Sequence, residues 1–407
     1  MTRPELPPRV LVLGMARSGR AAAAALERRG VEVVAADRSH GTDEERSLLE
    51  GAGLVVKSPG VPGENALVRE ARARGIPVWS EVELGFRILE QPLLGVTGTN
   101  GKTTTSELLG AMLRADGRET AVAGNVGRPL CALDGLLSAD GWIVCELSSF
   151  QLEDVHELRP RVAILLNVEP DHLDRHGTLD DYRAAKLRIF ARQRADDVAV
   201  VPAGFQPELP GGARRVEFRF DDPLPAEPLV PGDHNRENAA AATAAARAVG
   251  VPEAAIAEAL RTFPGVEHRL EPIAEVAGVR YVNDSKATNT AAARRALAAY
   301  ADTPLRLILG GSLKGESFQP LAAALGPNVR AAYLIGQAAA DLAAALEPAG
   351  VRVVRCGDLE TAVALAASEA RPGEVVLLSP ACASFDQFEN FEHRGEEFRR
   401  LVQNLGA

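Results

Sequence analysis

Cysteine, long apolar runs and surplus positive charge are all scarce in this sequence, and each scarcity excludes a class of protein. Only four cysteines occur among 407 residues, none in a Cys-x-x-Cys pair, which indicates reduced, mostly buried thiols and a cytoplasmic protein. No run approaches the ~20 apolar residues of a membrane span, and Met1–Val10 lacks the apolar core of an export signal. The net charge of −10 leaves no basic stripe for a nucleic acid. We therefore expect neither a membrane nor a nucleic acid among the partners.

Lysine is also scarce. Of the 45 basic residues 40 are arginines, and the five lysines are Lys57, Lys102, Lys186, Lys286 and Lys314. Arginine serves wherever a generic positive charge suffices, whereas a compact ammonium or an amine that can lose its proton requires lysine. The lysines are therefore the first candidates for specific chemical roles. Lys57, beside Ser58-Pro59-Gly60, is the exception, and we interpret it as a loop charge near a substrate.

Length and the order of the predicted elements indicate an α/β protein of three domains. A chain of 407 residues exceeds one ordinary hydrophobic core, and its 46% hydrophobic and 25% charged residues are normal for a soluble globular protein. Apolar strands alternate with Ala- and Leu-rich helical stretches, which predicts parallel, doubly wound sheets. We place a Rossmann-like domain at residues 1–90, a P-loop-type ATPase domain at 91–265 and a doubly wound domain at 266–407. The breakers Phe263-Pro264-Gly265 are the expected hinge.

The first domain opens with a strand, a glycine turn, a helix and a second strand. The turn spans Gly14–Gly19, and the second strand, Val31–Ala36, ends in Asp37. Amides at the start of the helix can face a phosphate, and the acid can meet a ribose or a base. Because the spacing is not Gly-x-Gly-x-x-Gly, a nicotinamide site is disfavoured. A nucleotide-sugar site and a purely structural turn both stay open on these residues.

The central domain carries a phosphate-binding motif. Leu93–Thr97 is an apolar strand, Gly98-Thr99-Asn100-Gly101 a loop, and Lys102-Thr103-Thr104 opens a helix. Amides of such a loop cradle phosphates, the lysine neutralises the β and γ charge, and the hydroxyl after it binds Mg²⁺. Val96 stands where the first glycine of Gly-x-x-x-x-Gly-Lys-Ser/Thr belongs, so the match is incomplete. Strand, loop and Lys-Thr together still predict ATP binding.

Charged residues follow two further strands of this domain. Trp142–Cys145 is an apolar strand that ends in Glu146, and an acid in this place beside a phosphate loop holds the metal. Val162–Asn167 runs into the charged loop Glu169–His176, at the end of a strand where ligands bind in open α/β sheets. A merely solvated loop is the alternative for this second segment.

Lys186 lies on the apolar face of the next predicted helix. The helix begins at Thr178-Leu179-Asp180-Asp181, and Lys186 falls four residues after Tyr182 and three before Ile189, on the face that they share. The side chain could simply extend along the apolar surface to water. If it is buried, its pKa is lowered and its amine becomes nucleophilic. It could then act as a base, or capture CO₂ as a carbamate that binds a second Mg²⁺.

Seven ordered blocks resemble those of the Mur ligases, the cytoplasmic enzymes that build the peptide stem of the bacterial cell wall. The blocks are Gly98–Thr103, Glu146–Gln151, Asn167–His176, Gly232–Asn238, His268-Arg269, Asn283–Asn289 and Ser379–Phe388. The family's shortened phosphate loop accounts for Val96, and Lys186 falls at the position that the family carbamylates. The last two blocks resemble those of members that add D-glutamate, and the Asp-Asn-Pro-Arg block of diaminopimelate-adding relatives is absent. Departures are modest: Glu169 replaces the commoner Thr, Pro202–Pro231 is short, and Met15-Ala16-Arg17 is an individual version of the first turn.

The resemblance implies a ligase that forms an amide through an acyl-phosphate. ATP would phosphorylate the alanyl carboxylate of UDP-MurNAc-L-Ala, and the amine of D-glutamate would then displace phosphate. Two Mg²⁺ ions would take part, the first on Thr103 and Glu146, the second on His172 and carbamylated Lys186. Two lysines, Lys286 and Lys314, suit an acceptor that carries two carboxylates.

The resemblance also implies which residues carry each role. The catalytic set would be Lys102, His172, Lys186 and Lys286. The ATP-binding set would be Gly98, Thr99, Asn100, Gly101, Lys102, Thr103, Thr104, Asn235, Asn238, Arg269 and Asp284. The substrate-binding set would be Asp37, Arg38, Ser58, Asn125, Ser148, His172, Thr288, Lys314, Ser384 and Phe391. Taken alone, Asn125 could be a turn residue, Lys314 an exposed loop lysine and Phe391 part of the core.

Other functions stay open at this point. The same chemistry could add a different amino acid to a muramoyl nucleotide or to a folate, although Asp284–Asn289 favours D-glutamate. A P-loop phosphotransferase would end at the phosphorylated substrate, and it would release ADP with no amino acid present. A non-enzymatic nucleotide-binding scaffold is disfavoured by the presence of Lys102, Glu146, His172 and Lys186. A nicotinamide dehydrogenase is disfavoured by the glycine spacing of the first turn. A monomer is the default expectation.

Overall fold

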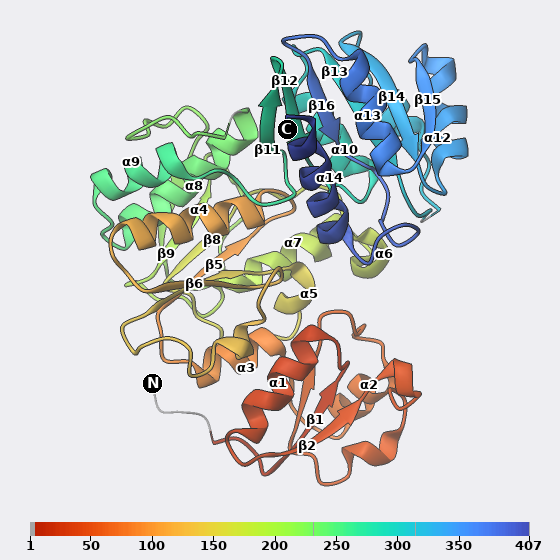
Figure 1. Cartoon of the computed structure of the whole chain (residues 1–407). Helices are drawn as coiled ribbons and strands as arrows, with labels where there is room; N and C mark the ends of the chain where they lie inside the picture. The colour runs from red at the N-terminus through yellow and green to blue at the C-terminus, as the bar shows by residue number, and fades with distance from the viewer. Residues whose placement is uncertain (1–4, 231, 314, 407) are drawn as a thin grey trace. The chain divides into compact units, whose positions relative to one another are not determined.

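Strands and helices alternate along the chain, as the sequence predicts (Figure 1). The computed structural model describes residues 5–230, 232–313 and 315–406. They form two compact units: the first holds the chain up to Leu229 together with Asp233–Phe263, and the second holds Val230, Gly232 and the chain from Pro264 onward. Within these residues, two sheets belong to the first unit and one to the second, which confirms the α/β class and the largely parallel sheets.

The N-terminal sheet of the first unit is parallel, in the order β2-β1-β3-β4. Its elements are β1 Arg9–Leu13, α1 Arg17–Glu27, β2 Glu32–Ala36, the 3₁₀ turns η1 Arg38–His40 and η2 Arg46–Leu49, β3 Leu54–Lys57, α2 Ala66–Ala73, β4 Val78–Ser80 and α3 Glu81–Ile88. Helices α1 and α3 pack on one face and α2 with η2 on the other, so β1 is apolar on both sides. The turn after β1 requires glycine, because a Cβ on Gly19 would lie 1.9 Å from the Gly14 carbonyl oxygen.

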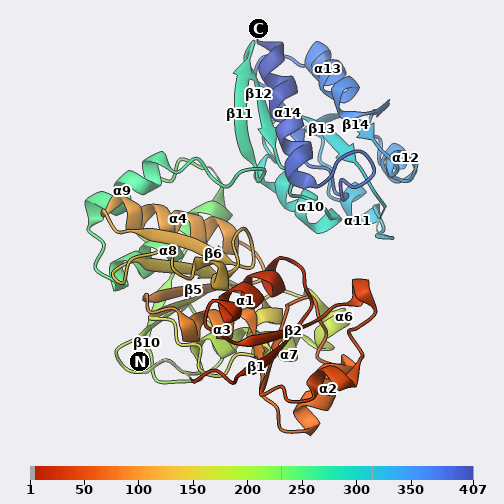
Figure 2. The ribbon, with the colours of Figure 1, turned by 60° about the horizontal axis from the view of Figure 1, so that its bottom comes forward.

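The central sheet of the same unit is also parallel, in the order β10-β9-β8-β5-β7-β6. Its strands are β5 Leu93–Thr97, β6 Thr120–Gly124, β7 Trp142–Glu146, β8 Val162–Leu165, β9 Val198–Pro202 and β10 Arg214–Phe218. Its helices are α4 Lys102–Ala115, η3 Leu130–Leu133, α5 Ser149–Leu152, α6 Leu173–His176, α7 Leu179–Leu187, η4 Arg188–Phe190, α8 Asp233–Ala248 and α9 Glu253–Thr262. Helices α4, α8 and α9 pack together on one face (Figure 2). Because β5 lies between β7 and β8, the carboxyl ends of these three strands meet at one edge of the sheet.

The sheet of the second unit has the order β11-β12-β16-β13-β14-β15, with β11 antiparallel at its edge. Its strands are β11 Glu271–Val276, β12 Val279–Asn283, β13 Leu305–Gly310, β14 Val329–Ile335, β15 Val353–Gly357 and β16 Val375–Leu378. Its helices are α10 Thr290–Ala299, α11 Gln319–Ala322, α12 Ala339–Leu346, η5 Glu347–Ala349, α13 Leu359–Glu369 and α14 Phe391–Leu405. Helices α10 to α12 cover one face, and α13 and α14 cover the other.

Four strands, β6, β9, β10 and β11, are not predicted from the sequence. All but β9 are edge strands: β10 has the sequence Arg-Arg-Val-Glu-Phe, and β11 contains Pro272. Charged residues and proline are tolerated at an edge because one side of such a strand has no ladder partner. The apolar runs that identify buried strands are therefore missing from β10 and β11, whereas β9 does contain such a run, Val198–Val201.

The cysteines follow the prediction of buried, reduced thiols. Cys131, Cys145 and Cys382 are buried and Cys356 is half-buried, and none of these four described residues forms a disulfide. Burial raises the pKa of the Cys131 and Cys145 thiols well above its ordinary value. Throughout the part of the chain that the structure describes, no helix combines the length and the apolar character needed to span a membrane.

Glu81, the first residue of α3, is a fully buried carboxyl group. Its Oε1 accepts a hydrogen bond from the Cys131 amide at 2.6 Å, and among the described atoms Oε2 has no hydrogen-bond partner. Burial raises the pKa of Glu81 from 4.5 to about 7, against the smaller opposing effect of the Cys131 amide. Between these two pH values the folded protein keeps a proton that the unfolded chain releases, so stability falls as the pH rises through this window.

The Glu81→Gln side chain is neutral at every pH. The effect of this substitution on stability, relative to wild type, should therefore be more favourable in alkaline than in acid solution. We expect the difference in unfolding free energy between variant and wild type to be about 2–3 kcal/mol more favourable at pH 8 than at pH 4.5. Urea unfolding at the two pH values measures this difference. Glu83→Gln is the matched control. Glu83 accepts hydrogen bonds from the amides of His156, Glu157 and Leu158 and from the Arg87 side chain. Loss of its charge should therefore destabilise the protein at both pH values. An equal effect of Glu81→Gln at both pH values would contradict the raised pKa.

Candidate active site

The predicted phosphate loop connects β5 to α4. Gly98 has φ +156° and Gly101, the residue before α4, has φ +82°, so the loop amides turn where a residue with a side chain is strained. A Cβ on Gly101 would also lie 2.2 Å from Asn238 Oδ1. Asn238, on α8, therefore contacts the loop, and Asn235 lies buried one turn earlier on the same helix. Both asparagines are ATP-binding residues in the prediction.

Asn167 holds the phosphate loop in shape, and sequence reasoning assigned it no role. Its Oδ1 accepts from the amides of Thr99 at 3.1 Å and Asn100 at 2.8 Å. Glu169 adds a second contact, because its Oε2 accepts from Asn100 Nδ2 at 2.8 Å. Asn167 follows β8 directly, which places its side chain beside the loop that follows β5. The sequence signal that could have identified Asn167 is its position directly after a buried strand and before a charged loop.

Two lysine ammonium groups bind the same carbonyl oxygen of this loop. Lys102 Nζ donates to Gly98 O at 2.9 Å and to Thr99 O at 3.0 Å, and Lys186 Nζ donates to Gly98 O at 2.8 Å. Lys186 is 1% exposed and its Nζ lies 4.3 Å from the centre of the Tyr182 ring. Burial, and then the charge of Lys102, lower the pKa of Lys186 to about 7. The prediction of a buried lysine with a nucleophilic amine therefore agrees with its environment.

A cluster of rings joins Lys186 to His172. The ring of Tyr182 lies 5.2 Å from His176, that of His176 lies 5.5 Å from Phe150, and that of Phe150 lies 4.8 Å from His172. His172 is exposed, has the left-handed backbone φ of 51°, and its Nε2 lies 3.5 Å from Asp171 Oδ2. A left-handed backbone is strained at a residue that carries a side chain, and such strain is common at functional sites. Lys186 and His172, the predicted ligands of a second metal ion, thus lie at the two ends of one cluster.

Glu146 and Thr103, which are predicted to bind the first Mg²⁺, lie near the carboxyl ends of two neighbouring strands of the central sheet, β7 and β5. Glu146 ends β7 and is buried, and its Oε1 accepts from Asn125 Nδ2 at 2.9 Å. Thr103 lies in the first turn of α4, and Ser148 caps α5. Among the described residues no group of three or more His, Cys, Asp or Glu side chains could hold a metal by itself. Magnesium is commonly held by one or two carboxylates with phosphate oxygens and waters, so Glu146 and Thr103 fit an ion that arrives with a nucleotide.

The N-terminal sheet brings together Asp37, Ser58 and the glycine turn. The Asp37 carboxylate accepts from the hydroxyl and amide of Ser39 and from the amide of Met15. The Ser39 hydroxyl, followed by these amides, lowers the pKa of Asp37 to about 2. Ser58 Oγ donates to Gly14 O at 2.6 Å, and Arg38 is exposed. Part of the binding capacity of Asp37 is therefore already used to shape the turn.

The structure contradicts the interpretation of Lys57 made from the sequence. Lys57 is the last residue of β3 and is fully buried, so the reading of Lys57 as a loop charge is wrong. Its Nζ lies 2.9 Å from Asp154 Oδ2 and 3.3 Å from Glu153 Oε2. The acidic partners follow almost a hundred residues later in the sequence, which is why the lysine looked solvated.

The second unit groups most of its predicted residues where its parallel strands end. Lys286 Nζ lies 5.8 Å from the centre of the Phe391 ring, and the Thr288 amide donates to Lys286 O at 2.8 Å. Asp284 accepts from Ser379 Oγ at 2.7 Å. Burial raises the pKa of Asp284 to about 7, opposed by Ser379 and by the charge of Arg269. Lys314, also assigned to substrate binding, lies outside the described residues.

Arg394 organises these loops, and sequence reasoning missed it. It is fully buried in α14, and its guanidinium donates to the Ser285 hydroxyl at 2.9 Å and to the carbonyl oxygens of Ser285 at 2.9 Å, Cys382 at 3.1 Å, Ala383 at 3.3 Å and Gly310 at 3.4 Å. Ser285 follows β12, Gly310 is the last residue of β13, and Cys382 and Ala383 follow β16 and lead into Ser384. Burial lowers the pKa of Arg394 to about 10. No sequence pattern distinguishes Arg394 from the other arginines among the 40 in the chain.

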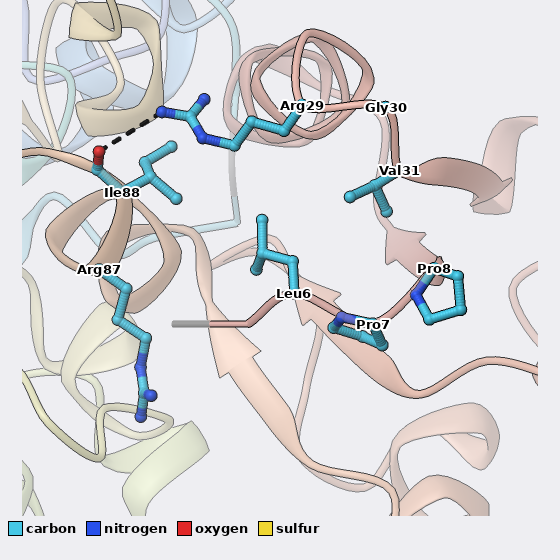
Figure 3. A pocket seen from close by; sticks show the side chains of 8 residues that line it. All are labelled: Leu6, Pro7, Pro8, Arg29, Gly30, Val31, Arg87 and Ile88. Atoms are coloured by element: carbon cyan, nitrogen blue, oxygen red, sulfur yellow. Dashed lines mark hydrogen bonds between the residues drawn. The ribbon is translucent and has the colours of Figure 1, made fainter. Parts of the chain in front are cut away.

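A cavity of about 310 Å³ lies elsewhere in the first unit (Figure 3). Its lining includes Leu6, Val31 and Ile88, and it opens where β1 and β2 begin, at the opposite edge from the glycine turn. The Arg29 side chain at its rim is already paired with Asp134 and bonded to the Ile88 carbonyl. This cavity is therefore separate from the residues assigned to substrates.

Known proteins resemble this chain over nearly its whole length. The Mur ligase middle domain matches residues 96–207, and the Mur ligase glutamate ligase domain matches residues 268–382. The chain is 44% identical to the UDP-N-acetylmuramoylalanine–D-glutamate ligase of Anaeromyxobacter dehalogenans, over 99% of both chains. It is 41% identical to the ligase of the same name from Acidobacterium capsulatum, over 97% of this chain and 96% of that one.

Solved structures share the fold at lower identity. The UDP-N-acetylmuramate–alanine ligase of Thermotoga maritima has a TM-score of 0.61 at 19% identity, over 97% of this chain and 99% of that one. A folylpolyglutamate synthase/dihydrofolate synthase from Yersinia pestis, with AMPPNP and Mn bound, has a TM-score of 0.57 at 20% identity, over 77% of this chain and 90% of that one. At these identities the likeness concerns the fold alone.

Proposed function

This chain belongs to the Mur ligase family, and on that premise we propose that it joins D-glutamate to UDP-N-acetylmuramoyl-L-alanine with ATP as the energy source. The observation that carries the choice of reaction is the identity of 40–44% to ligases of that name over nearly the whole chain. The pairing of Lys102 with the buried Lys186 on one phosphate-loop carbonyl supports acyl-phosphate chemistry at that loop. A supply of cytoplasmic ATP fits the location expected from the sequence.

The reaction proceeds in two displacements. A carboxylate oxygen of the alanyl group attacks the γ-phosphorus of ATP, and the bond to the β-phosphate oxygen breaks, which gives an acyl-phosphate and ADP. The amine of D-glutamate then attacks the acyl carbon, phosphate leaves, and the nitrogen loses a proton to solvent. Lys102 and the amides of Gly101 and Lys102 orient the phosphates and offset their charge, which is the main task in such transfers. The amides of Thr99 and Asn100 already donate to Asn167, which holds the loop in shape before ATP binds.

Glu146 and Thr103 would hold the Mg²⁺ that accompanies the nucleotide, with Glu146 kept in place by Asn125. Lys186 would carry a carbamate: its neutral amine attacks the carbon of CO₂ and releases one proton to solvent, so that the neutral amine becomes a carbamate anion. With His172 this carbamate would hold a second Mg²⁺. The ions would supply positive charge where oxygen charge builds up.

We assign the amino acid to the second unit. Lys286 provides a cation for a carboxylate, Thr288 and Ser384 provide hydroxyl groups, and Phe391 provides an apolar wall beside Lys286. Lys314 would provide the second cation. Asp284 and Arg269 would contact the nucleotide, and the Gly14 turn with Asp37, Arg38 and Ser58 would take the UDP-sugar.

The direct test measures phosphate release with Mg-ATP and UDP-MurNAc-L-Ala across a panel of amino acids. We expect release with D-glutamate, and at least about 100-fold less with L-glutamate or other acceptors, because a wrongly placed amine loses the benefit of positioning. Release with a different amino acid would keep the mechanism and overturn the acceptor assignment. Release of ADP with no amino acid would indicate a phosphotransferase. No release with any acceptor would refute the proposed ligase.

A further inference from the structure

Lys57 has no place in the reaction proposed above, yet it lies in a buried network of charges. Its side chain is 0% exposed, and its Nζ contacts Asp154 Oδ2 at 2.9 Å and Glu153 Oε2 at 3.3 Å. It also donates to the carbonyl oxygen of Val61 at 3.2 Å. A charge without water needs such partners, because the loss of hydration is otherwise uncompensated. Three contacts from one ammonium fix both Val61 and the two acids.

Arg175 approaches the same loop from α6. Its Nε and one terminal nitrogen donate to the two oxygens of Glu153 at 3.0 and 2.6 Å, a fork geometry that fixes the orientation of the guanidinium. The remaining donors reach the carbonyl oxygens of Pro59 at 2.9 Å and Val61 at 3.2 Å. Lys57 and Arg175 therefore share both an acid, Glu153, and an acceptor, the Val61 carbonyl.

On its other side, the loop Ser58–Val61 supports the glycine turn. Ser58 Oγ donates to Gly14 O at 2.6 Å, and a Cβ on Gly14 would lie 2.9 Å from Val61 Cγ2. The Val61 side chain therefore packs directly against the turn. This is the turn that we assign to the UDP-sugar.

Arg175 also connects the network to His172. Its guanidinium carbon lies 4.1 Å from the centre of the Phe150 ring, which lies 4.8 Å from the His172 ring. Arg175 and His172 are three residues apart, and the Arg175 amide donates to His172 O at 3.1 Å. One set of charges thus contacts the UDP-sugar turn on one side and the residues around His172 on the other.

We propose that Lys57, acting through Glu153 and Arg175, is a positioning residue that sets the UDP-sugar turn relative to the residues that surround the reacting carboxylate. This inference rests on the proposed function, which assigns the turn and His172 to the same substrate. In-line attack tolerates little misplacement, and a shift of about 1 Å can cost about 100-fold in rate. In this role Lys57 acts through its protein partners and not on the substrate directly.

Lys57→Met tests the proposal, because it keeps the length of the side chain and removes the charge. We expect the KM for UDP-MurNAc-L-Ala to rise about 10-fold and kcat to fall about 10-fold, on the order of a sub-ångström displacement. The KM for D-glutamate and the Kd for an ATP analogue should stay within about twofold, since the phosphate loop and the second unit are untouched. Glu153→Gln, a milder change, should show the same pattern and serves if Lys57→Met does not fold.

Arg159→Met is the matched control. Arg159 pairs with the buried Asp197 at 2.6 Å in the same unit, so its loss should lower stability without changing the KM for the UDP-sugar. Arg175→Met and the double variant complete the test. If Lys57 and Arg175 act together, their effects on kcat/KM for the UDP-sugar should fall short of additivity by about fivefold or more.

Two outcomes would overturn the inference: lower stability of Lys57→Met with an unchanged KM for the UDP-sugar, or fully additive effects of the two variants. Failure of the proposed function looks different, because wild-type protein would then release no phosphate with D-glutamate. In that case titration calorimetry with UDP tests the same network. Binding about tenfold weaker in Lys57→Met than in wild type or Arg159→Met supports the positioning role, and equal binding refutes it.

Discussion

Lys102→Met should lower kcat/KM for phosphate release by about 1,000-fold or more, with the fold unchanged. The ammonium of Lys102 lies on the carbonyl oxygens of Gly98 and Thr99, within the loop whose amides we assign to the ATP phosphates. A methionine occupies similar space but cannot neutralise phosphate charge, and loss of one such charge contact costs about 10²–10³ or more in phosphoryl transfer. Steady-state kinetics with Mg-ATP, UDP-MurNAc-L-Ala and D-glutamate measure the loss.

Arg114→Met is the matched control for Lys102→Met. Arg114 lies on the same helix, is exposed, and donates to the Thr120 carbonyl at 3.4 Å. Its removal takes away one positive charge without touching the loop, and we expect activity within about twofold of wild type. Comparable losses in the two variants would mean that Lys102 contributes only general charge, and would argue against the assigned phosphate site.

Lys186→Ala should lower kcat by about 100-fold or more, and short carboxylates should restore part of the activity. The burial and lowered pKa of Lys186 leave a large fraction of its amine neutral at pH 7, as carbamate formation requires. Alanine leaves a cavity in which acetate or formate can supply anionic oxygens, in place of the carbamate. Activity measured with and without these salts, at constant ionic strength, gives the rescue.

The Lys186→Met variant distinguishes a carbamate role of Lys186 from a role in packing alone. Methionine fills the space against Tyr182 but carries no anion, so we expect it to be as inactive as Lys186→Ala and insensitive to added carboxylates. In wild-type protein at limiting CO₂, activity should fall as the pH drops below about 7, because protonation removes the amine that binds CO₂. An active Lys186→Met variant would show that the lysine only packs against the helix.

Local patterns predicted the strand, glycine loop and helix at Leu93–Thr104 and the burial of Lys186. Gly98–Gly101 forms the loop and Lys102 begins α4, and the helical spacing of Lys186 from Tyr182 and Ile189 correctly predicts its burial. In both cases the residues that make the pattern lie close together in the sequence. The same holds for the position of Glu146, since the buried strand and its terminal acid are the five consecutive residues Trp142–Glu146.

Residues whose role depends on distant partners were not predictable in this way. Asn167 shapes a loop 67 residues earlier, and Lys57 finds Glu153 96 residues later. Arg394 contacts carbonyl oxygens at the carboxyl ends of three separate strands, and the sequence does not show which backbone carbonyl a side chain will contact. A single sequence shows which residue types are present, whereas the pairing of charges with remote backbone atoms emerges only from the fold.

The order of strands in the second unit has a consequence for synthesis of the chain. Strand β16, near the end of the chain, lies between β12 and β13, so this sheet cannot close until residue 378 has been made. The first unit, in contrast, is complete at Phe263. At about 5–20 residues per second, the 144 residues that follow take roughly 7–30 s to synthesise. During that time the first unit can fold on the ribosome, while β12 and β13 each wait with an unpaired apolar edge that is open to aggregation.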